Sequence, residues 1–256
     1  MTCSVLVGLH SQIFQDATQR VSSEFQITSL PLRDAAPADF QLYLPLTLAD
    51  YAELRTGPGV NFLPKAVVPS EDAVATCDDK LTFVEAIRAA GLAPYVPRCL
   101  DAPVAYPYVL KKRRGDFGRG TIAVIDQIGH EEADRTFSAI DYFWQELILG
   151  DVEYATHVLM HAGQIAYHFT TVFKMGSQSI IKGINANGKY AGHKDAAAFI
   201  DLFQDMLNVV GFSDGVCCST LYRPSPTTPN PNNPIDNRLC VSINAVVLVD
   251  HFQVPR

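Results

Sequence analysis

The sequence predicts an α/β protein with more than one lobe. Its first part alternates strand-like apolar runs with helical segments, an order typical of a parallel sheet: strands 4–9, 25–30 and 40–44, and helices 11–21 and 47–55. Its second half carries consecutive strand-like runs instead. These are interrupted by one amphipathic helix over residues 195–210, whose apolar residues recur at helical spacing from Phe199 to Val210. The change of pattern favours separate lobes.

Composition limits the class of protein. The chain has 256 residues, 48% of them hydrophobic, which is enough for a substantial core. It contains no uninterrupted apolar run of about 18 residues, and its first residues lack the basic start of a signal peptide. The net charge of −7 argues against a nucleic-acid surface. Six scattered cysteines are typical of a reduced, cytoplasmic protein.

The pattern breaks at Thr56-Gly57-Pro58-Gly59 and resumes after Pro69, which places a first boundary there. A helix is expected to begin after Asp78-Asp79, because aspartate favours a helix N-terminus, and to end at Gly91. The remaining expected elements are strands 106–110, 121–124, 141–149, 153–160 and 164–173, a polar helix over 131–140, and two last strands over 216–222 and 239–249. A proline- and asparagine-rich loop separates these last two strands.

The stretch YPYVLKKRRGDFGRGTIAV, residues 106–124, is the most informative part of the chain. A buried strand ends in the four cations Lys111–Arg114, and three glycines follow before a second β-branched run. Glycine lets backbone N–H groups approach an anion closely, while lysine and arginine offset the anion's charge. The pattern therefore indicates a hairpin that clamps a polyphosphate. A surface hairpin with a basic tip is the alternative.

Three segments, taken in order, resemble the ATP-grasp superfamily. DDKLTFVEAIRAAGLAPYVP (Asp78–Pro97) is similar to a family segment in which a lysine opens a helix, and YPYVLKKRRGDFGRG is similar to its glycine-rich clamp. FWQELILGDVEYATHVL (Phe143–Leu159) is similar to the family's hinge. The resemblance covers nearly the whole chain. It implies a short N-terminal α/β lobe with a parallel sheet (1–69), a central lobe with the clamp (70–145) and a C-terminal lobe (146–256).

The resemblance also implies an activity. An enzyme of this superfamily would use ATP and Mg²⁺ to join a carboxylate to an amine or similar nucleophile through an acyl-phosphate. The expected partners are small-molecule or peptide carboxylates and amines, together with a second copy of the chain, whereas neither nucleic acid nor a membrane is expected. The alternative is an ATP-grasp-like nucleotide-binding or interaction protein that has lost its magnesium site and does not catalyse.

By the same resemblance, one group of residues would contact the phosphates. Lys80, at a helix start, would reach the triphosphate, and Lys111 would contact the α-phosphate and the adenine edge. The loop from Gly115 to Gly120 would fold over the β- and γ-phosphates, with Gly118 and Arg119 inside it. Taken alone, Lys80 could equally be a solvated lysine.

A second group would contact the adenosine. Gln145 stands where the family has a side chain facing the adenine amino group, and the backbone from Glu146 to Ile148 would pair with the adenine edge. Glu153 would accept hydrogen bonds from the ribose hydroxyls, because an ionised carboxylate is only an acceptor. Gln145 and Glu153 could also be ordinary polar residues of strand edges.

The last two strands depart from the family pattern. The family has an acidic residue about five positions after a glycine, and Glu-x-Asn on the next strand, as metal ligands. If the glycine is Gly215, the acidic position is Thr220. Glu-x-Asn becomes Ser242-Ile243-Asn244, so that Asn244 alone remains, and the family's arginine is replaced by Cys218. Mg²⁺ favours carboxylate oxygens, so this site is degenerate unless a nearby acid substitutes: Asp214, Asp236 or Asp250.

The remaining candidates are possible metal ligands and one lysine, and their patterns are less specific. His157 and His161 have the spacing of a helical metal site, but their segment alternates like a strand. Cys217, Cys218 and Cys240 could hold a soft metal, with buried thiols as the alternative. Lys182, in the polar stretch SQSIIKGINANGKYAGHKD, is the candidate catalytic residue, as a phosphate contact in a substrate loop.

Overall fold

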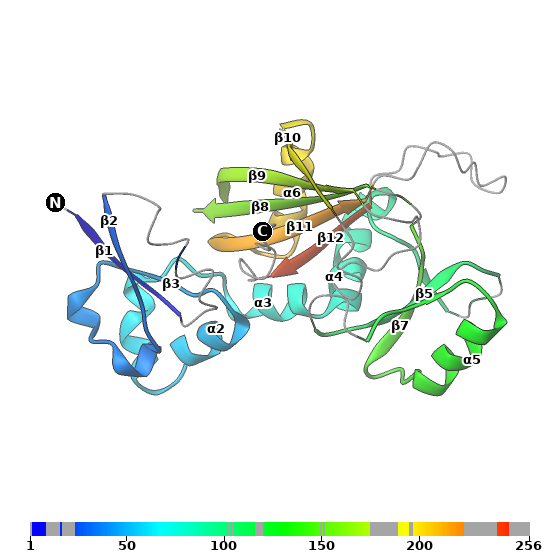
Figure 1. Cartoon of the computed structure of the whole chain (residues 1–256), viewed down its shortest axis with the longest axis horizontal. Coiled ribbons are helices and arrows are strands. Elements are labelled where there is room, and N and C mark those ends of the chain that lie inside the picture. The colour runs from blue at the N-terminus through cyan, green and yellow to red at the C-terminus, as the bar shows by residue number, and fades with distance from the viewer. Residues whose placement is uncertain are drawn as a thin grey trace.

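The computed structural model describes residues 2–8, 16, 24–101, 103, 105–115, 120–148, 150, 152–174, 189–194, 197–222 and 240–245. Within these residues the chain forms three sheets, of three, four and five strands. The three-stranded sheet lies at one end of the molecule, the five-stranded sheet in the middle and the four-stranded sheet at the other end (Figure 1). None of the helices in this part of the chain combines the length and apolar character of a membrane span.

The N-terminal sheet is parallel, with β1 (Cys3–Val7) between β2 (Phe25–Ser29) and β3 (Leu42–Leu44). This confirms the parallel order expected from the sequence; the expected helix over 11–21 lies outside the described residues except for Asp16. Helix α2 (Leu48–Leu54) begins after Thr47, whose side chain accepts a hydrogen bond from the Asp50 N–H at 3.1 Å. The Asp50 carboxylate accepts from the Thr47 N–H in return, which completes a capping box.

The segment where the sequence pattern breaks belongs to this first core. It folds into η3 (Gly57–Lys65), and Phe62 is buried there with Leu6, Tyr43 and Leu54. Two shorter 3-10 turns, η1 (Leu32–Asp34) and η2 (Pro37–Asp39), complete the lobe. Residues 57–65 therefore belong to the N-terminal core, and the next helix begins at Glu71.

The four-stranded sheet has the order β4-β7-β5-β6 and is antiparallel: β4 (Cys99–Leu100), β5 (Tyr108–Lys112), β6 (Ile122–Val124) and β7 (Tyr142–Glu146). The predicted hairpin is confirmed, since β5 pairs with β6 in antiparallel register. Helix α5 (Gln127–Thr136) packs on one face of this sheet, where Ala133 contacts Tyr108, Leu110 and Trp144. The sequence predicts this helix over 131–140. It begins earlier because the Asp126 side chain caps it by accepting from the Gly129 N–H at 2.9 Å.

The five-stranded sheet is antiparallel and has the order β10-β9-β8-β11-β12. Its members are β8 (Val152–His161), β9 (Gln164–Lys174), β10 (Lys189–Lys194), β11 (Gly215–Tyr222) and β12 (Cys240–Ala245). Strands β8 and β9 join through Ala162-Gly163, both with positive φ, as a tight turn requires. Strand β10 corrects the prediction of a polar loop over this stretch. Pairing with β9 orders its backbone, and such long-range pairing is not visible in the local sequence.

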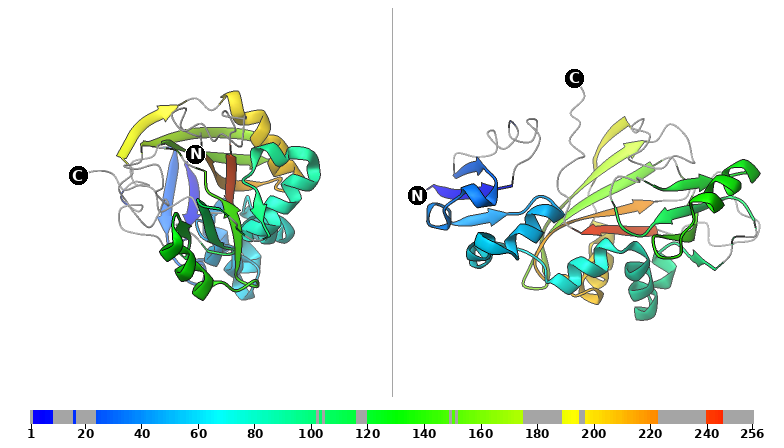
Figure 2. Two further views of the ribbon diagram at one scale, coloured as in Figure 1. Left: turned by 90° about the vertical axis from the view of Figure 1, so that its right-hand side faces the viewer. Right: turned by 90° about the horizontal axis from the view of Figure 1, so that it is seen from below.

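Three helices cover one face of the five-stranded sheet: α3 (Glu71–Asp78), α4 (Lys80–Ile87) and α6 (Ala197–Val209) (Figures 1 and 2). Their shared core includes Phe83, Phe203 and Met206 from the helices, and Val158 and Cys217 from the strands. Helix α4 starts where the sequence predicts it. It continues through a π turn (Arg88–Leu92) and the turn η5 (Ala93–Tyr95), and Gly91 takes a φ of 85°. Helix α3 is not predicted by the apolar pattern.

The core between the three helices and the five-stranded sheet is expected to contribute most to the free energy of unfolding. Phe203 is fully buried, so Phe203→Ala should lower the free energy of unfolding by about 3–5 kcal/mol through lost burial and a cavity. Val209 lies on the same helix with 38% exposure, and Val209→Ala is the matched control, with an expected loss within about 0.5 kcal/mol. Urea denaturation measures both changes. Equal losses in the two variants would contradict this assignment of the core.

Candidate functional site

Two polar side chains, Lys111 and Gln145, share one face of the four-stranded sheet. In the register of β5 and β7, Val109 is opposite Gln145 and Lys111 is opposite Phe143. Because side chains alternate along a strand, Lys111 and Gln145 therefore lie on the same face. Tyr108, Leu110 and Trp144 occupy the other face, against α5. The sequence-predicted pair of ATP-binding residues is thus brought together on the face opposite α5, where Val109 and Phe143 are also buried.

The Gln145 amide has a free donor in this structure. Its side chain is 2% exposed, and its Oε1 accepts a hydrogen bond from Lys111 Nζ at 3.5 Å. Lysine offers only donors, which identifies the other amide atom as Nε2. In the described part of the chain, Gln145 Nε2 has no hydrogen-bond partner. A buried donor without a partner costs free energy, and it suits a ligand with an acceptor atom, such as a ring nitrogen.

The Lys111 ammonium is easier to deprotonate than an ordinary lysine. Burial of the half-buried side chain, and next the positive charge of Lys80, lower the pKa of Lys111 to about 8. Two ammonium groups near each other repel in the absence of an anion. Lys80 and Lys111 thus form an electropositive place that a phosphate group would stabilise.

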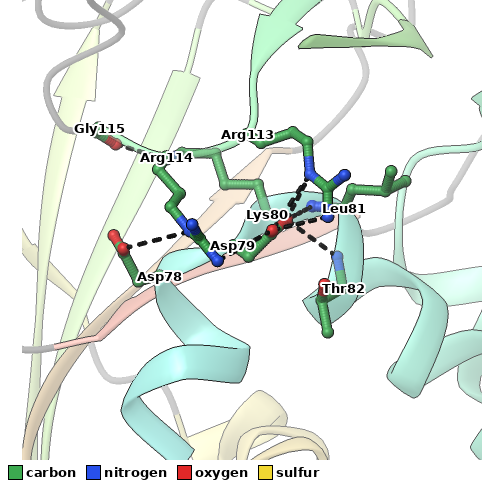
Figure 3. A network of polar contacts seen from close by, with 8 residues as sticks. All are labelled: Asp78, Asp79, Lys80, Leu81, Thr82, Arg113, Arg114 and Gly115. Atoms are coloured by element: carbon green, nitrogen blue, oxygen red, sulfur yellow. Dashed lines mark hydrogen bonds and ion pairs between the residues drawn. The ribbon is translucent and has the colours of Figure 1, made fainter. Parts of the chain in front are cut away.

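Lys80 contacts the start of the glycine loop. It is the first residue of α4, and its Nζ donates to the carbonyl oxygen of Gly115 (Figure 3). Gly115 has a φ of 125° and Gly120 a φ of 73°, a backbone region that favours glycine. A Cβ at Gly120 would also meet Lys112 Cδ at 3.2 Å. Gly118 and Arg119 lie outside the described residues, so their contact with phosphates stays a prediction.

Arg113 has a different role from the one suggested by the run of four cations. Its guanidinium donates to Asp79, from Nη2 to Oδ2 at 2.7 Å and from Nε to both carboxylate oxygens at 3.1 Å. Arg114 is 69% exposed, and its guanidinium lies 3.9 Å from Asp78 and 3.7 Å from Asp79. From the sequence, we expect the two aspartates only to cap a helix. The sequence feature that indicates this ion pair is the combination of two acidic residues before a helix with a run of four cations in a later segment.

The hinge segment follows β7 directly. The Glu146 N–H donates to the Arg98 carbonyl at 2.9 Å, and Arg98 Nε donates to the Glu146 carboxylate at 2.7 Å. No hydrogen bond in the described part of the chain involves the backbone of Leu147 or Ile148. Glu153 lies on β8, fully buried, opposite Phe173 of β9 and Tyr222 of β11.

The register of the five-stranded sheet tests the predicted metal positions. Thr220 is opposite Ser242, and Cys218 is opposite Asn244, on adjacent strands β11 and β12. Val158 and Cys217, which are opposite each other, face the helices, so these four positions lie on the other face. The register therefore places these four positions side by side on adjacent strands. No carboxylate occupies any of the four, so the residues present do not fit Mg²⁺.

Asp214 does not take over this role. Its carboxylate accepts from the Ala162 N–H at 2.9 Å and from Ser213 Oγ at 2.9 Å, and lies 3.2 Å from His161 Nδ1. The hydrogen bond from Ala162, despite partial burial, lowers the pKa of Asp214 below its ordinary value. Asp214 thus fixes the β8–β9 turn, directly before the first residue of β11, Gly215, whereas Thr220 lies near the other end of that strand. Asp236 and Asp250 lie outside the described residues.

The other candidates remain dispersed. His157 stacks on Phe169 with ring centroids 4.6 Å apart, while His161 contacts Asp214. Cys217 is a free thiol in the core, and burial raises its pKa well above the ordinary value. In the described residues, no group of three or more His, Cys, Asp and Glu side chains could hold a metal ion. Lys182 lies outside the described residues.

Comparison with known proteins finds similarity in the fold but not in the sequence. No protein-family model matches the sequence, and no curated protein has a matching sequence. Solved structures match with low identity. The VanG D-Ala:D-Ser ligase from Enterococcus faecalis has 13% identity and a TM-score of 0.62, with 96% of this chain and 91% of that one covered. The L-amino acid ligase from Bacillus licheniformis has 14% identity and a TM-score of 0.58, with 95% and 67% covered.

A third match is N5-carboxyaminoimidazole synthase from Aspergillus clavatus, solved in complex with ADP and a ribonucleotide. It has 15% identity and a TM-score of 0.60, with 95% of this chain and 69% of that one covered. At such identities a structural match shows the fold, and the match extends over almost all of this chain. It agrees with the three segments that carry the sequence resemblance. The protein has the ATP-grasp fold.

Proposed function

We propose that this protein binds an adenine nucleotide between its four-stranded and five-stranded sheets, and that it uses ATP to join a carboxylate to an amine or similar nucleophile. The observation that carries the nucleotide site is the Lys111–Gln145 pair, with a lowered lysine pKa and a buried amide donor without a partner. The structural matches named above include ligases and a synthase solved with ADP, which supports the proposal.

Each contact follows from the chemistry of the residues. Lys80, Lys111 and the glycine loop, with Arg119, would surround the phosphates. Gln145 and the backbone from Glu146 to Ile148 would pair with the adenine edge. Glu153 would accept from the ribose hydroxyls, which requires the buried carboxylate to reach the ligand.

In the proposed reaction, a carboxylate oxygen bonds to the γ-phosphorus of ATP and ADP leaves. The amine nitrogen then bonds to the acyl carbon, and inorganic phosphate leaves with the electrons of the broken C–O bond. The protein's contribution is to position the reactants and to neutralise charge around the transferred group. Because the positions on β11 and β12 do not fit magnesium, the chain's own cations are the groups that act here. Lys182 is the candidate for a further phosphate contact during transfer.

A second candidate function is nucleotide binding without catalysis. The register of β11 and β12 favours it, because it pairs Thr220 with Ser242 and Cys218 with Asn244. By the sequence resemblance, Thr220 and Ser242 replace acids and Cys218 replaces an arginine, while Asn244 is kept. Neutral oxygens hold a divalent ion weakly compared with carboxylates. Turnover measurements separate the two candidates.

Lys111→Ala is expected to weaken ATP binding by roughly 1.5–3 kcal/mol, because a charge-assisted contact is lost. Lys112→Ala is the matched control, since the neighbouring residue is exposed and points to the other face of β5. Isothermal titration calorimetry measures both. An unmodified protein that binds no ATP, or equal losses in the two variants, would contradict the site.

ATP binding is expected to take up a proton above about pH 8. The free protein has a Lys111 pKa of about 8, and a bound phosphate would raise it toward the ordinary value for lysine. Binding therefore favours the protonated state, and affinity should fall by up to about tenfold per pH unit above pH 8. Calorimetry in two buffers of different ionisation enthalpy measures the uptake. The same uptake in Lys111→Ala would assign it to another group.

ATP turnover by the unmodified protein is expected to be slow and nearly independent of magnesium, with a panel of carboxylates and amines as substrates. Restoring the acids with Thr220→Asp and Ser242→Glu should raise magnesium-dependent turnover at least about tenfold. Gln164→Glu, at an exposed position of β9, is the charge control. Rapid magnesium-dependent turnover by the unmodified protein would refute the degenerate metal site and leave ligation as its function.

A further inference from the structure

We propose that the Asp79–Arg113 ion pair is a strut that fixes the start of α4 to the base of the glycine loop, and so sets the position of Lys80 relative to that loop. This inference rests on the proposed nucleotide site and assigns positioning roles within it. Neither residue is expected to touch the nucleotide. Figure 3 shows the two side chains between α4 and the end of β5.

The contacts around the strut tie three elements together. Asp79 caps α4, because its Oδ1 accepts from the N–H groups of Leu81 at 3.2 Å and Thr82 at 3.3 Å. The same carboxylate receives the forked Arg113 guanidinium. The Arg113 N–H donates to the Asp141 carbonyl at 2.7 Å, just before β7. The end of β5, the start of α4 and the residue before β7 are thus held at one point.

Lys80 is positioned by the same contacts. Its backbone N–H donates to the Arg113 carbonyl at 2.9 Å, while its Nζ reaches the Gly115 carbonyl. Both ends of Lys80 therefore contact the segment 113–115, which leads into the glycine loop. A shift of Arg113 would move the Lys80 ammonium and the loop apart. Because a phosphate must meet both, the strut determines whether they act together.

Burial and charge distinguish the strut from a surface ion pair. Asp79 is 4% exposed, and the Arg113 side chain is 27% exposed. Burial alone would raise the pKa of Asp79, but hydrogen bonds from Arg113 and the Thr82 N–H, with nearby arginine charges, lower it below its ordinary value overall. The carboxylate therefore stays ionised and neutralises Arg113. A guanidinium committed in this way is a poor phosphate ligand, in contrast to Lys80 and Lys111.

The geometry calls for arginine and aspartate in particular. Arginine presents a planar fork that matches both oxygens of a carboxylate, whereas lysine offers a single point charge. Arg113→Lys keeps the net charge and removes the fork, so a purely electrostatic role predicts unchanged binding of phosphates. Asp79→Asn leaves the Arg113 charge uncompensated, so a purely electrostatic role predicts tighter binding. A positioning role predicts weaker binding in both variants.

The experiment measures the affinity of each variant for ATP, inorganic tripolyphosphate and adenosine by calorimetry. Arg113→Lys and Asp79→Asn are expected to weaken ATP and tripolyphosphate binding about tenfold or more, and to leave adenosine binding unchanged. Asp126→Asn is the matched control, because Asp126 caps α5 as Asp79 caps α4, and it follows the end of β6 that is remote from the glycine loop. It should change none of the three affinities. A lowered melting temperature with unchanged ligand selectivity would show a merely structural role.

Two outcomes would overturn the inference. One is ATP and tripolyphosphate affinity that is unchanged or higher in Arg113→Lys and Asp79→Asn; the other is an equal loss for adenosine. If the unmodified protein binds none of the three ligands, the proposed nucleotide site fails. Amide hydrogen exchange then decides on the strut separately: faster exchange of the Lys80 and Arg113 N–H groups in Arg113→Lys supports it, and unchanged exchange overturns it.

Discussion

In the part of the chain that the structure describes, helices pack on one face of each large sheet. The alternation of side chains along each strand decides which residues lie on the other face. In the four-stranded sheet, Tyr108 and Leu110 pack against α5, which turns Lys111 to the opposite side. In the five-stranded sheet, Cys217 enters the core with α3, α4 and α6, which turns Cys218 away from it. The alternation of side chains along each strand thus directs apolar residues into the core and polar residues to the opposite face of the sheet.

The same constraint separates the scaffold of the candidate site from its chemistry. Strands β11 and β12 pair in antiparallel register, and Cys217 of β11 lies in the core. Thr220 and Ser242 are good strand residues at these positions. Neutral side chains at these positions are thus compatible with the observed pairing of the two strands.

The basic residues at the end of β5 and directly after it have different roles. Lys111 lies on the sheet face opposite α5 and has a lowered pKa, whereas Arg113 is paired with a buried carboxylate. The difference follows from their side chains. A guanidinium can donate to both oxygens of one carboxylate, and an ammonium is a compact charge that can be aimed at a phosphate. Net charge alone would count the two residues as equivalent.

The sequence by itself determined the periodic elements: the parallel strands of the first lobe, the hairpin of β5 and β6, the turn at Ala162-Gly163 and helix α6. These follow from apolar spacing and turn residues, which act locally. It also determined the order of segments that resembles the ATP-grasp superfamily, and the structural matches confirm that fold.

Only the tertiary structure decided the strand β10, the pairing of Asp79 with Arg113, the free Gln145 amide and the role of Asp214 at a turn. Each depends on residues far apart in the chain. A carboxylate near one helix is a cap, an ion-pair partner or a metal ligand according to what the fold brings beside it. Local patterns specify strands and helices, whereas the partners of buried polar groups are set by long-range packing.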